Sequence, residues 1–207
     1  MLAAFDDFRA VFRGAGGHAS TPHAARDPIP AIGPFIDGLS HVAARETDPD
    51  DRAVFSVTYV RAGTTDNVIP ADAICAGTIR TLSPPARARA REKLQRVARG
   101  VAASHGLELS LELFDGYPPT VNDSAVLGVV ERSALELGLP TRSMPSPFMG
   151  AEDFSYMLSS VPGAMVFLGC RMEGGGPMHS DVMKLDEDVL TTGAALHATV
   201  ALRLLGG

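Results

Sequence analysis

Two histidines lie in glycine-rich loops, where an imidazole is free to do chemistry. His18 follows three nearby glycines in the segment GAGGHASTPH, and His179 follows a run of three glycines in GGGPMHS. Neutral imidazole is a common ligand for zinc and similar ions, and a ligand on a loop at the end of a strand suits an open catalytic site. Each signal is weak alone, because a loop histidine is often an exposed bystander and the glycines before His18 also suit a tight turn.

Other familiar signatures of catalysis are missing from the sequence. It contains no Gly-x-x-x-x-Gly-Lys-Ser/Thr phosphate loop, no Gly-x-Ser-x-Gly elbow and no His-Glu-x-x-His zinc helix. Cys75 and Cys170 are too few for a disulfide framework and lack paired metal-ligand spacing, so we interpret both as small core residues. The candidate chemistry therefore depends on isolated side chains and on the elements that position them.

Composition limits the class of protein. The 207 residues are 45% hydrophobic and 20% charged, enough apolar material for one large domain or two small ones. The net charge of -6 provides no broad basic surface for a phosphate backbone, so nucleic acid is not an expected partner. The one basic cluster, residues 87–99, also carries Leu94 and Val97 and predicts a solvated helix face.

No apolar run approaches the roughly 18 to 20 residues that a membrane span needs. The first residues also lack the basic-then-apolar layout of a signal peptide. We therefore expect no membrane partner and a cytoplasmic location.

The first half of the chain predicts a ferredoxin-like domain over residues 4–116. Leucines at 107, 109, 111 and 113 alternate with polar residues, the period-two pattern of a half-buried strand. Together with strands near 8–13, 54–60 and 74–80 and helices near 27–39 and 84–106, the order is β-α-β-β-α-β. This order predicts an antiparallel sheet with both helices on one face.

The second half, residues 117–207, predicts mainly helices. A helix capped by Asn122 or Asp123 is expected to end at Gly138, with a short helix near 152–158 and a final helix near 186–205. The segment 164–168 is the one evident strand. This half therefore looks like part of an α/β domain whose sheet is supplied elsewhere.

Four motifs, in order and across nearly the whole chain, resemble the dinuclear-metal amidohydrolases that include aminoacylase, hippurate hydrolase and the plant indole-acetyl-amino-acid hydrolases. They are GAGGHASTPHAARDP, RETDP followed by NVIPADAICAGTIRT, MGAEDFSY, and HSDVMKLDEDVL. The resemblance implies that residues 4–116 are a lid or dimerisation domain and that residues 117–207 are the C-terminal part of an incomplete zinc-peptidase-like catalytic domain. Family members carry about as much chain again before the lid, holding most of the metal ligands and the general base.

The resemblance also assigns roles to single residues. His179 matches the last metal ligand of the family, and His18 matches a lid histidine that reaches across a dimer to stabilise the oxyanion. Asn67 and Arg80 resemble lid residues that hold the amide or carboxylate of the substrate, and Glu152 matches a loop near the substrate. Two plainer interpretations stay open: Arg80 as a surface strand residue and Glu152 as an acid at a helix N-terminus.

The match near His179 is incomplete. Asp181 and Met183 stand where the family usually has a proline and an aromatic residue, so the loop geometry there is less closely matched.

The function implied by the resemblance is metal-dependent hydrolysis of N-acyl amino acids, with two divalent ions (Zn or Mn) and a homodimer formed through the lid. Peptidase or dipeptidase action on short peptides is an alternative within the family. A non-catalytic dimerisation module is another, because this chain holds one of the three or four ligands that a catalytic zinc requires. A truncated product whose tail helices expose an uncovered apolar face is a third.

Overall fold

The computed structural model describes residues 1–206 and divides into two compact units. Unit 1 consists of residues 1–120 and 147–156, and unit 2 of residues 121–146 and 157–206.

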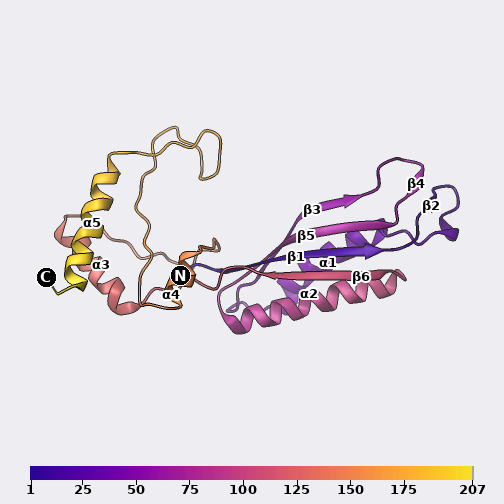
Figure 1. Cartoon of the computed structure of the whole chain (residues 1–207), viewed down its shortest axis with the longest axis horizontal. Coiled ribbons are helices and arrows are strands. Elements are labelled where there is room, and N and C mark those ends of the chain that lie inside the picture. Colours follow the sequence, from indigo (N-terminus) through magenta and orange to yellow (C-terminus); the bar gives the residue numbers. More distant parts are fainter. Residues whose placement is uncertain (207) are drawn as a thin grey trace. The chain divides into compact units, whose positions relative to one another are not determined.

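Unit 1 is built on a four-stranded antiparallel sheet (Figure 1). Its order is β3-β5-β1-β6, with the bounds β1 (Ala4–Arg13), β3 (Val54–Ala62), β5 (Asp72–Thr81) and β6 (Glu108–Asp115). The central strand β1 pairs on one side with β5, from Ala4 opposite Thr81 to Arg13 opposite Asp72, and on the other side with β6. This arrangement confirms the predicted ferredoxin-like fold.

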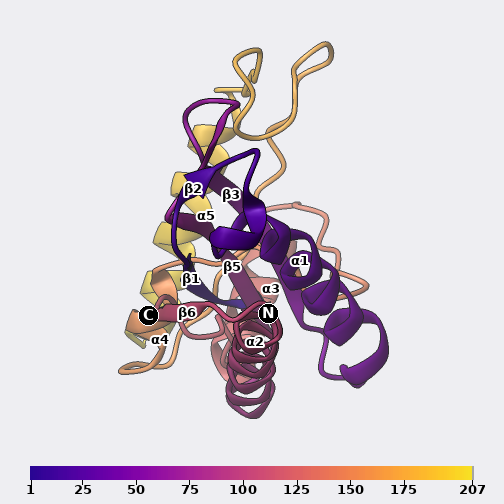
Figure 2. The ribbon, with the colours of Figure 1, turned by 90° about the vertical axis from the view of Figure 1, so that its right-hand side faces the viewer.

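Two helices cover one face of the sheet (Figure 2). The first begins as a 3-10 turn (Ile29–Ala31), continues as α1 (Ile32–His41) and ends in a π turn (Val42–Glu46). Pro34 lies in the first turn of α1, where its missing N–H costs no helical hydrogen bond. The second helix, α2 (Pro84–Ser104), begins after Ser83, whose Oγ accepts a hydrogen bond from the backbone N of Ala86 at 3.2 Å.

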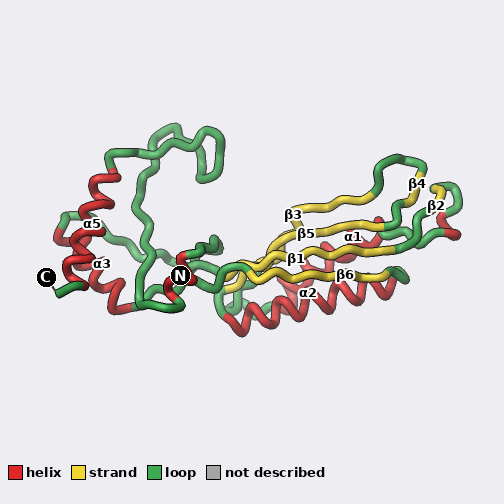
Figure 3. Tube along the Cα trace, viewed as in Figure 1, coloured by secondary structure: helices red, strands yellow, loops and turns green. Residues whose placement is uncertain are grey.

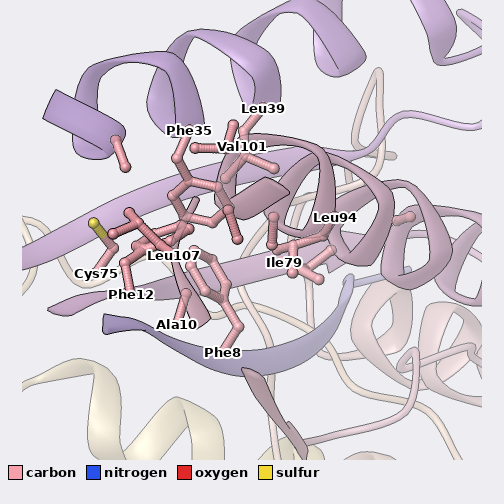
Figure 4. Close-up of a cluster of buried hydrophobic side chains, with 14 residues drawn as sticks. Phe8, Ala10, Phe12, Phe35, Leu39, Cys75, Ile79, Leu94, Val101 and Leu107 are labelled. Carbon is pink, nitrogen blue, oxygen red and sulfur yellow. The ribbon is translucent and has the colours of Figure 1, made fainter. Parts of the chain in front are cut away.

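The core of unit 1 lies between the sheet and these helices (Figure 4). Alternate side chains of β1 point into it, and the Phe12 and Phe8 rings contact the Phe35 ring edge-on, at centroid distances of 5.5 and 6.1 Å. Leu94 from α2 and Ile79 from β5 complete the cluster, and the Cys75 side chain is buried within it. The prediction of a core residue is therefore confirmed for Cys75 but not for Cys170 of unit 2, which is only partly buried.

Most of the basic side chains of α2 are paired with acids of unit 1. Four arginines of this helix form ion pairs with other elements: Arg87 and Arg91 each pair with Asp6 and Asp115, Arg89 with Asp51, and Arg96 with Glu46. The predicted helix is confirmed, and four of its six basic side chains are paired with acids within the unit.

Unit 2 contains two long helices that pack on each other, α3 (Ser124–Glu136) and α5 (Val189–Leu204). The Asp123 carboxylate caps α3 by accepting from the backbone N of Val126 at 2.9 Å, and Gly138 follows the helix with a φ of +70°. The short helix α4 (Phe154–Leu158) lies where the sequence passes from unit 1 to unit 2.

The strand predicted for residues 164–168 is wrong. Residues 159–188 contain no helix or strand (Figure 3). The side-chain amide of Asn122 forms hydrogen bonds with both backbone groups of Met165. Its Nδ2 donates to Met165 O, and its Oδ1 accepts from Met165 N, each at 2.9 Å. A β-prone segment forms a strand only when a neighbouring strand pairs with it, and the described part of unit 2 supplies no such partner.

No helix within residues 1–206 combines the length and apolar character needed to cross a membrane.

Candidate functional site

His18 lies on a two-residue ladder beyond the end of the main sheet (Figure 1). Strand β2 (Gly17–His18) pairs with β4 (Val68–Ile69), placing His18 opposite Val68, and the backbone N of Ala19 donates to Asn67 O at 3.1 Å. We call residues 14–26 and 63–71, which form this end of unit 1, the tip. The two predicted site residues His18 and Asn67 therefore lie together at the tip.

The glycines before His18 permit two segments of backbone to approach closely. A Cβ on Gly14 would lie 1.9 Å from the carbonyl O of Arg26, and a Cβ on Gly16 would lie 2.9 Å from the carbonyl O of Ile69. Both distances are shorter than a van der Waals contact, so any side chain would separate the segments. Glycine is needed here for steric room.

Local hydrogen bonds occupy the acceptor atoms of both tip residues. The Nδ1 of His18 lies 3.1 Å from the backbone N of Ser20 and 2.7 Å from its Oγ. The Thr65 hydroxyl donates to Asn67 Oδ1 at 3.2 Å. Within the described residues, His18 Nε2 and Asn67 Nδ2 make no hydrogen bond, and both side chains are exposed. The tip thus offers two free nitrogen donors.

A hollow of about 330 Å³ borders β4 at the same end of the unit. It is lined by Arg61, Ala62, Gly63, Thr64, Val68, Pro70, Asp72 and Ile74. One cation, one anion and several apolar walls define no single class of ligand.

Arg80 lies at the opposite end of β5. Its NH1 donates to the carbonyl O of Met149 at 3.0 Å, and its guanidinium carbon lies 5.1 Å above the centre of the Phe5 ring. We call Phe5, Arg80 and residues 147–153 the base of unit 1. The structure holds Arg80 firmly by these two contacts, so it is more than a free surface side chain.

Arg80 also differs from the other partly buried arginines. Arg87, Arg91 and Arg203 each form an ion pair with a carboxylate, whereas Arg80 has no carboxylate partner within residues 1–206. Charged side chains that leave the solvent are normally paired. The base therefore presents a partly desolvated cation that an anion could bind.

Glu152 lies in the same segment as Met149, just before α4. Its carbonyl O accepts hydrogen bonds from Ser155 N at 3.2 Å and from Ser155 Oγ at 2.7 Å. The segment is fastened to the start of the chain, since the backbone N of Ala3 donates to Gly150 O at 2.9 Å. The Glu152 carboxylate has no hydrogen bond or ion pair within the described chain. A position beside a helix N-terminus therefore explains this acid as well as substrate binding does.

The tip and the base are far apart in one chain. Asp72, at the tip end of β5, and Arg80 are eight residues apart along this strand. At a rise of about 3.3 Å per residue, this separation corresponds to about 26 Å. His18 lies further beyond Asp72, because the backbone N of Gly14, the residue after β1, already bonds to Ala71 O. One chain therefore cannot bring His18 and Arg80 to the same small molecule.

His179 belongs to unit 2 and has an unusual backbone. Its φ of +68° lies in the left-handed region, which costs a non-glycine residue about 1 kcal/mol or more. Its side chain is exposed, and the adjacent Ser180 closes a turn by donating its backbone N–H to Pro177 O at 3.1 Å. The loop thus holds the imidazole out from unit 2 at some conformational cost.

The described residues do not form a metal centre by themselves. No group of three or more His, Cys, Asp or Glu side chains within residues 1–206 is placed to hold a metal ion. His179 is a single candidate ligand, and a protein zinc site requires three or four.

Sequence reasoning missed Ser20, Thr65 and Phe5, which hold the candidate site residues in place. A hydroxyl two residues from a histidine, or two before an asparagine, is the local signal that could have identified Ser20 and Thr65. No local signal marks Phe5, because it meets Arg80 only through the pairing of β1 with β5.

The model of peptidase family M20/M25/M40 matches residues 10–203 of this chain. Among curated proteins, the thermostable carboxypeptidase 2 of Saccharolobus solfataricus is 36% identical over 207 residues, covering 98% of this chain and 52% of that protein. The N-acetylcysteine deacetylase of Bacillus subtilis is 37% identical over 206 residues, covering 99% and 53%. An IAA-amino acid hydrolase (ILR1-like 4) of Arabidopsis thaliana is 33% identical, covering 99% and 48%.

The chain is also similar in structure to solved structures of related proteins. A putative aminohydrolase from methicillin-resistant Staphylococcus aureus superposes with a TM-score of 0.81 at 28% identity, covering 98% of this chain and 53% of that one. The Bacillus subtilis YXEP protein, described as a dinuclear metal binding peptidase, superposes with a TM-score of 0.76 at 33% identity, covering 99% and 51%. The chain spans about half the length of the relatives it matches.

Proposed function

Because the chain belongs to peptidase family M20/M25/M40, we propose that it is half of a metal-dependent amidohydrolase that cleaves the amide bond of N-acyl amino acids. In this proposal residues 4–116 are the lid and residues 117–207 are the C-terminal part of the catalytic domain. Relatives named for deacetylation of N-acetylcysteine and for hydrolysis of IAA-amino acids support an acylated amino acid as the substrate. The cytoplasm stays a prediction from the sequence.

The observation that carries the substrate class is the unpaired guanidinium of Arg80. An N-acyl amino acid ends in a free α-carboxylate, and a guanidinium binds a carboxylate through two parallel hydrogen bonds. Met149 O occupies only NH1, which leaves donors on Arg80 for the substrate. Asn67 and Glu152 are proposed as further substrate contacts, Asn67 through its free Nδ2.

The distance between tip and base favours a site shared by two copies of the chain. We assign His18 and Asn67 of one copy and Arg80 of the other to the same substrate, with His18 as the catalytic residue that donates to the oxyanion. The edge strand β3 supports such a homodimer, because its outer backbone groups have no strand partner in the described chain and Tyr59 and Val60 are exposed along it.

His179 is proposed as one ligand of a pair of divalent ions, zinc or manganese, whose other ligands lie outside this chain. Its exposed imidazole and strained backbone suit that role. One imidazole cannot hold a metal pair, so the chemistry that this chain itself supplies is binding at the base and hydrogen-bond donation at the tip.

The proposal is tested by hydrolysis of N-acetyl and N-benzoyl amino acids and of dipeptides by the complete enzyme, in which this chain is joined to the half that carries the other metal ligands, with added Mn²⁺ or Zn²⁺ and with a chelator. The 207-residue chain alone is expected to be inactive, because its described residues offer a single candidate ligand. Metal-dependent release of the amino acid from acylated substrates is the expected result. Faster cleavage of dipeptides would favour the peptidase alternative, which the carboxypeptidase relatives support. No turnover by a stable dimer would favour the non-catalytic dimerisation module.

Arg80→Ala tests the carboxylate contact directly. We expect it to weaken binding of an N-acetyl amino acid at least tenfold, as loss of a charge-assisted pair does, while binding of the corresponding C-terminal amide changes little. Arg61→Ala is a matched control, since Arg61 lies on the same sheet and also has no carboxylate partner in the described chain. Equal losses in the two variants would contradict the proposed role of Arg80.

A further inference from the structure

A residue two positions along the chain determines which nitrogen of the His18 ring carries the proton. Ser20 places both its backbone N, at 3.1 Å, and its Oγ, at 2.7 Å, against His18 Nδ1. The Oγ alone is ambiguous, because a hydroxyl can donate or accept. The backbone N–H is not ambiguous, because it can only donate.

A nitrogen that accepts from a backbone N–H must carry a lone pair and no proton. His18 Nδ1 is therefore the acceptor, the Ser20 hydroxyl donates to it as well, and the proton of the neutral ring resides on Nε2. That Nε2 has no partner within the described residues. The contact thus aims a single N–H outward from the tip.

We propose that Ser20 is a positioning residue that fixes His18 as its Nε2–H tautomer and so makes the tip a hydrogen-bond donor toward the reacting carbonyl oxygen. The catalytic consequence rests on the proposed function, whereas the tautomer does not. The same logic extends to Asn67, because the Thr65 hydroxyl occupies its Oδ1 and leaves Nδ2 to donate. A substrate oxygen that gains negative charge would meet two donors at the tip and no competing acceptor from these two side chains.

Ser20 acts through His18 and does not hold the fold together. Its side chain is exposed, and the turn that carries it is closed by other bonds, Thr21 N to His18 O at 2.9 Å and Ala19 N to Asn67 O at 3.1 Å. Replacing its hydroxyl should therefore leave the tip backbone intact.

Nitrogen NMR of the histidine rings in the 207-residue chain, at a pH of about 9 where histidine is neutral, tests the tautomer without any substrate. We expect His18 Nδ1 to give the resonance of an unprotonated ring nitrogen and Nε2 that of a protonated one, in a larger proportion than for His23. His23 is a suitable internal reference, because it lies in the same loop, is exposed and has no hydrogen bond from its ring within the described chain. A His18 ring protonated on Nδ1, or a tautomer ratio equal to that of His23, would overturn the proposal.

Three variants separate positioning from structure. Ser20→Ala keeps the backbone N–H at 3.1 Å but removes the Oγ contact at 2.7 Å. It should therefore shift the His18 tautomer ratio part of the way toward that of His23, and Ser20→Thr, which keeps the hydroxyl, should restore it. Ser40→Ala removes a hydroxyl that bonds to Ile36 O on α1 and should leave the ratio unchanged. If Ser20→Ala and Ser40→Ala have the same effect, Ser20 has no special role.

In an active preparation, Ser20→Ala should lower kcat roughly fivefold with little change in KM, and Ser20→Thr should recover the rate. An unchanged kcat would overturn the catalytic consequence even if the tautomer shift is seen. Absence of hydrolysis in every variant would count against the proposed function, while the NMR result would still decide the role of Ser20.

Discussion

In unit 1, Phe8, Phe12 and Phe35 are at most 1% exposed, whereas in unit 2 Leu190 and Leu202 of α5 are 69% and 63% exposed. The two units have comparable apolar content but differ in what covers it. In unit 1 a four-stranded sheet lies under two helices, and in unit 2 two helices have only each other and a long loop.

The difference indicates that unit 1 has the core of a self-sufficient domain and that unit 2 does not. A helix needs a second surface to bury its apolar side chains, and α5 has no buried residue. This agrees with a chain that spans about half the length of its relatives. The uncovered apolar face expected from the sequence is therefore present in unit 2.

Limited proteolysis should give the largest contrast between the units. We expect a non-specific protease to cut first within residues 159–188, which contain no helix or strand, and to leave a resistant fragment that retains residues 4–116. Mass spectrometry of the products identifies the cuts. Early cleavage inside β1 or α2 would contradict the idea that unit 1 is self-sufficient.

Truncation of one large side chain in each unit sharpens the comparison. Phe35→Ala should lower the free energy of unfolding by about 3–5 kcal/mol, because it leaves a cavity beside Phe8 and Phe12. Leu190→Ala, at an exposed site in unit 2, should change it by less than about 0.5 kcal/mol. Urea unfolding followed by circular dichroism measures both, and a similar loss from the two variants would show that unit 2 is more tightly packed than described.

Breaking the buried ion pair between Asp6 and Arg87 in unit 1 should have a smaller effect on the free energy of unfolding. Asp6 is 1% exposed and accepts from Arg87 Nε at 2.8 Å and from Arg87 NH2 at 2.5 Å. Asp6→Asn should cost about 3 kcal/mol, because it removes the buried carboxylate that pairs with Arg87 and leaves that cation only the more distant Asp115, at 3.7 Å. Asp7→Asn, on the exposed face of the same strand, is the matched control and should be nearly neutral. Equal stabilities in urea would mean that the pair contributes no net stability.

The Cys75 thiol should make stability depend on pH in the alkaline range. Burial raises the pKa of Cys75 from 9.0 to about 11. Between these values the unfolded chain loses the thiol proton and the folded chain keeps it, so the free energy of unfolding falls as the pH rises from about 9 to about 11. Cys75→Ala should flatten this decline relative to Cys170→Ala, as measured by urea midpoints across that range, and parallel declines would contradict it.

The sequence predicted the main sheet of unit 1 because its strands carry strong local patterns, such as the alternating leucines of β6. It did not predict the ladder of β2 and β4, since two residues are too few for a period to show. It wrongly predicted a strand at 164–168, because β-propensity depends on a neighbouring strand, and here the Asn122 side chain takes the backbone groups of Met165 instead.

The candidate site, too, could be predicted from the sequence only in part. The motifs indicated His18, Asn67, Arg80, Glu152 and His179, but not which of them lie near one another in unit 1. Whether an arginine has an acid partner depends on contacts distant in sequence, since Arg87 pairs with Asp6 across 81 positions. The roles assigned to these five residues stay predictions until they are tested.

The antiparallel strands β1 and β5 run unbroken for ten residues between the two ends of unit 1. A sheet of this kind is stiff along its strands, so it acts as a spacer of set length. Inserting two residues into each strand would move the tip outward by about 7 Å while preserving which side chains face the helices. The reach of the His18 imidazole is therefore controlled by strand length, a variable that no side-chain substitution at the tip can alter.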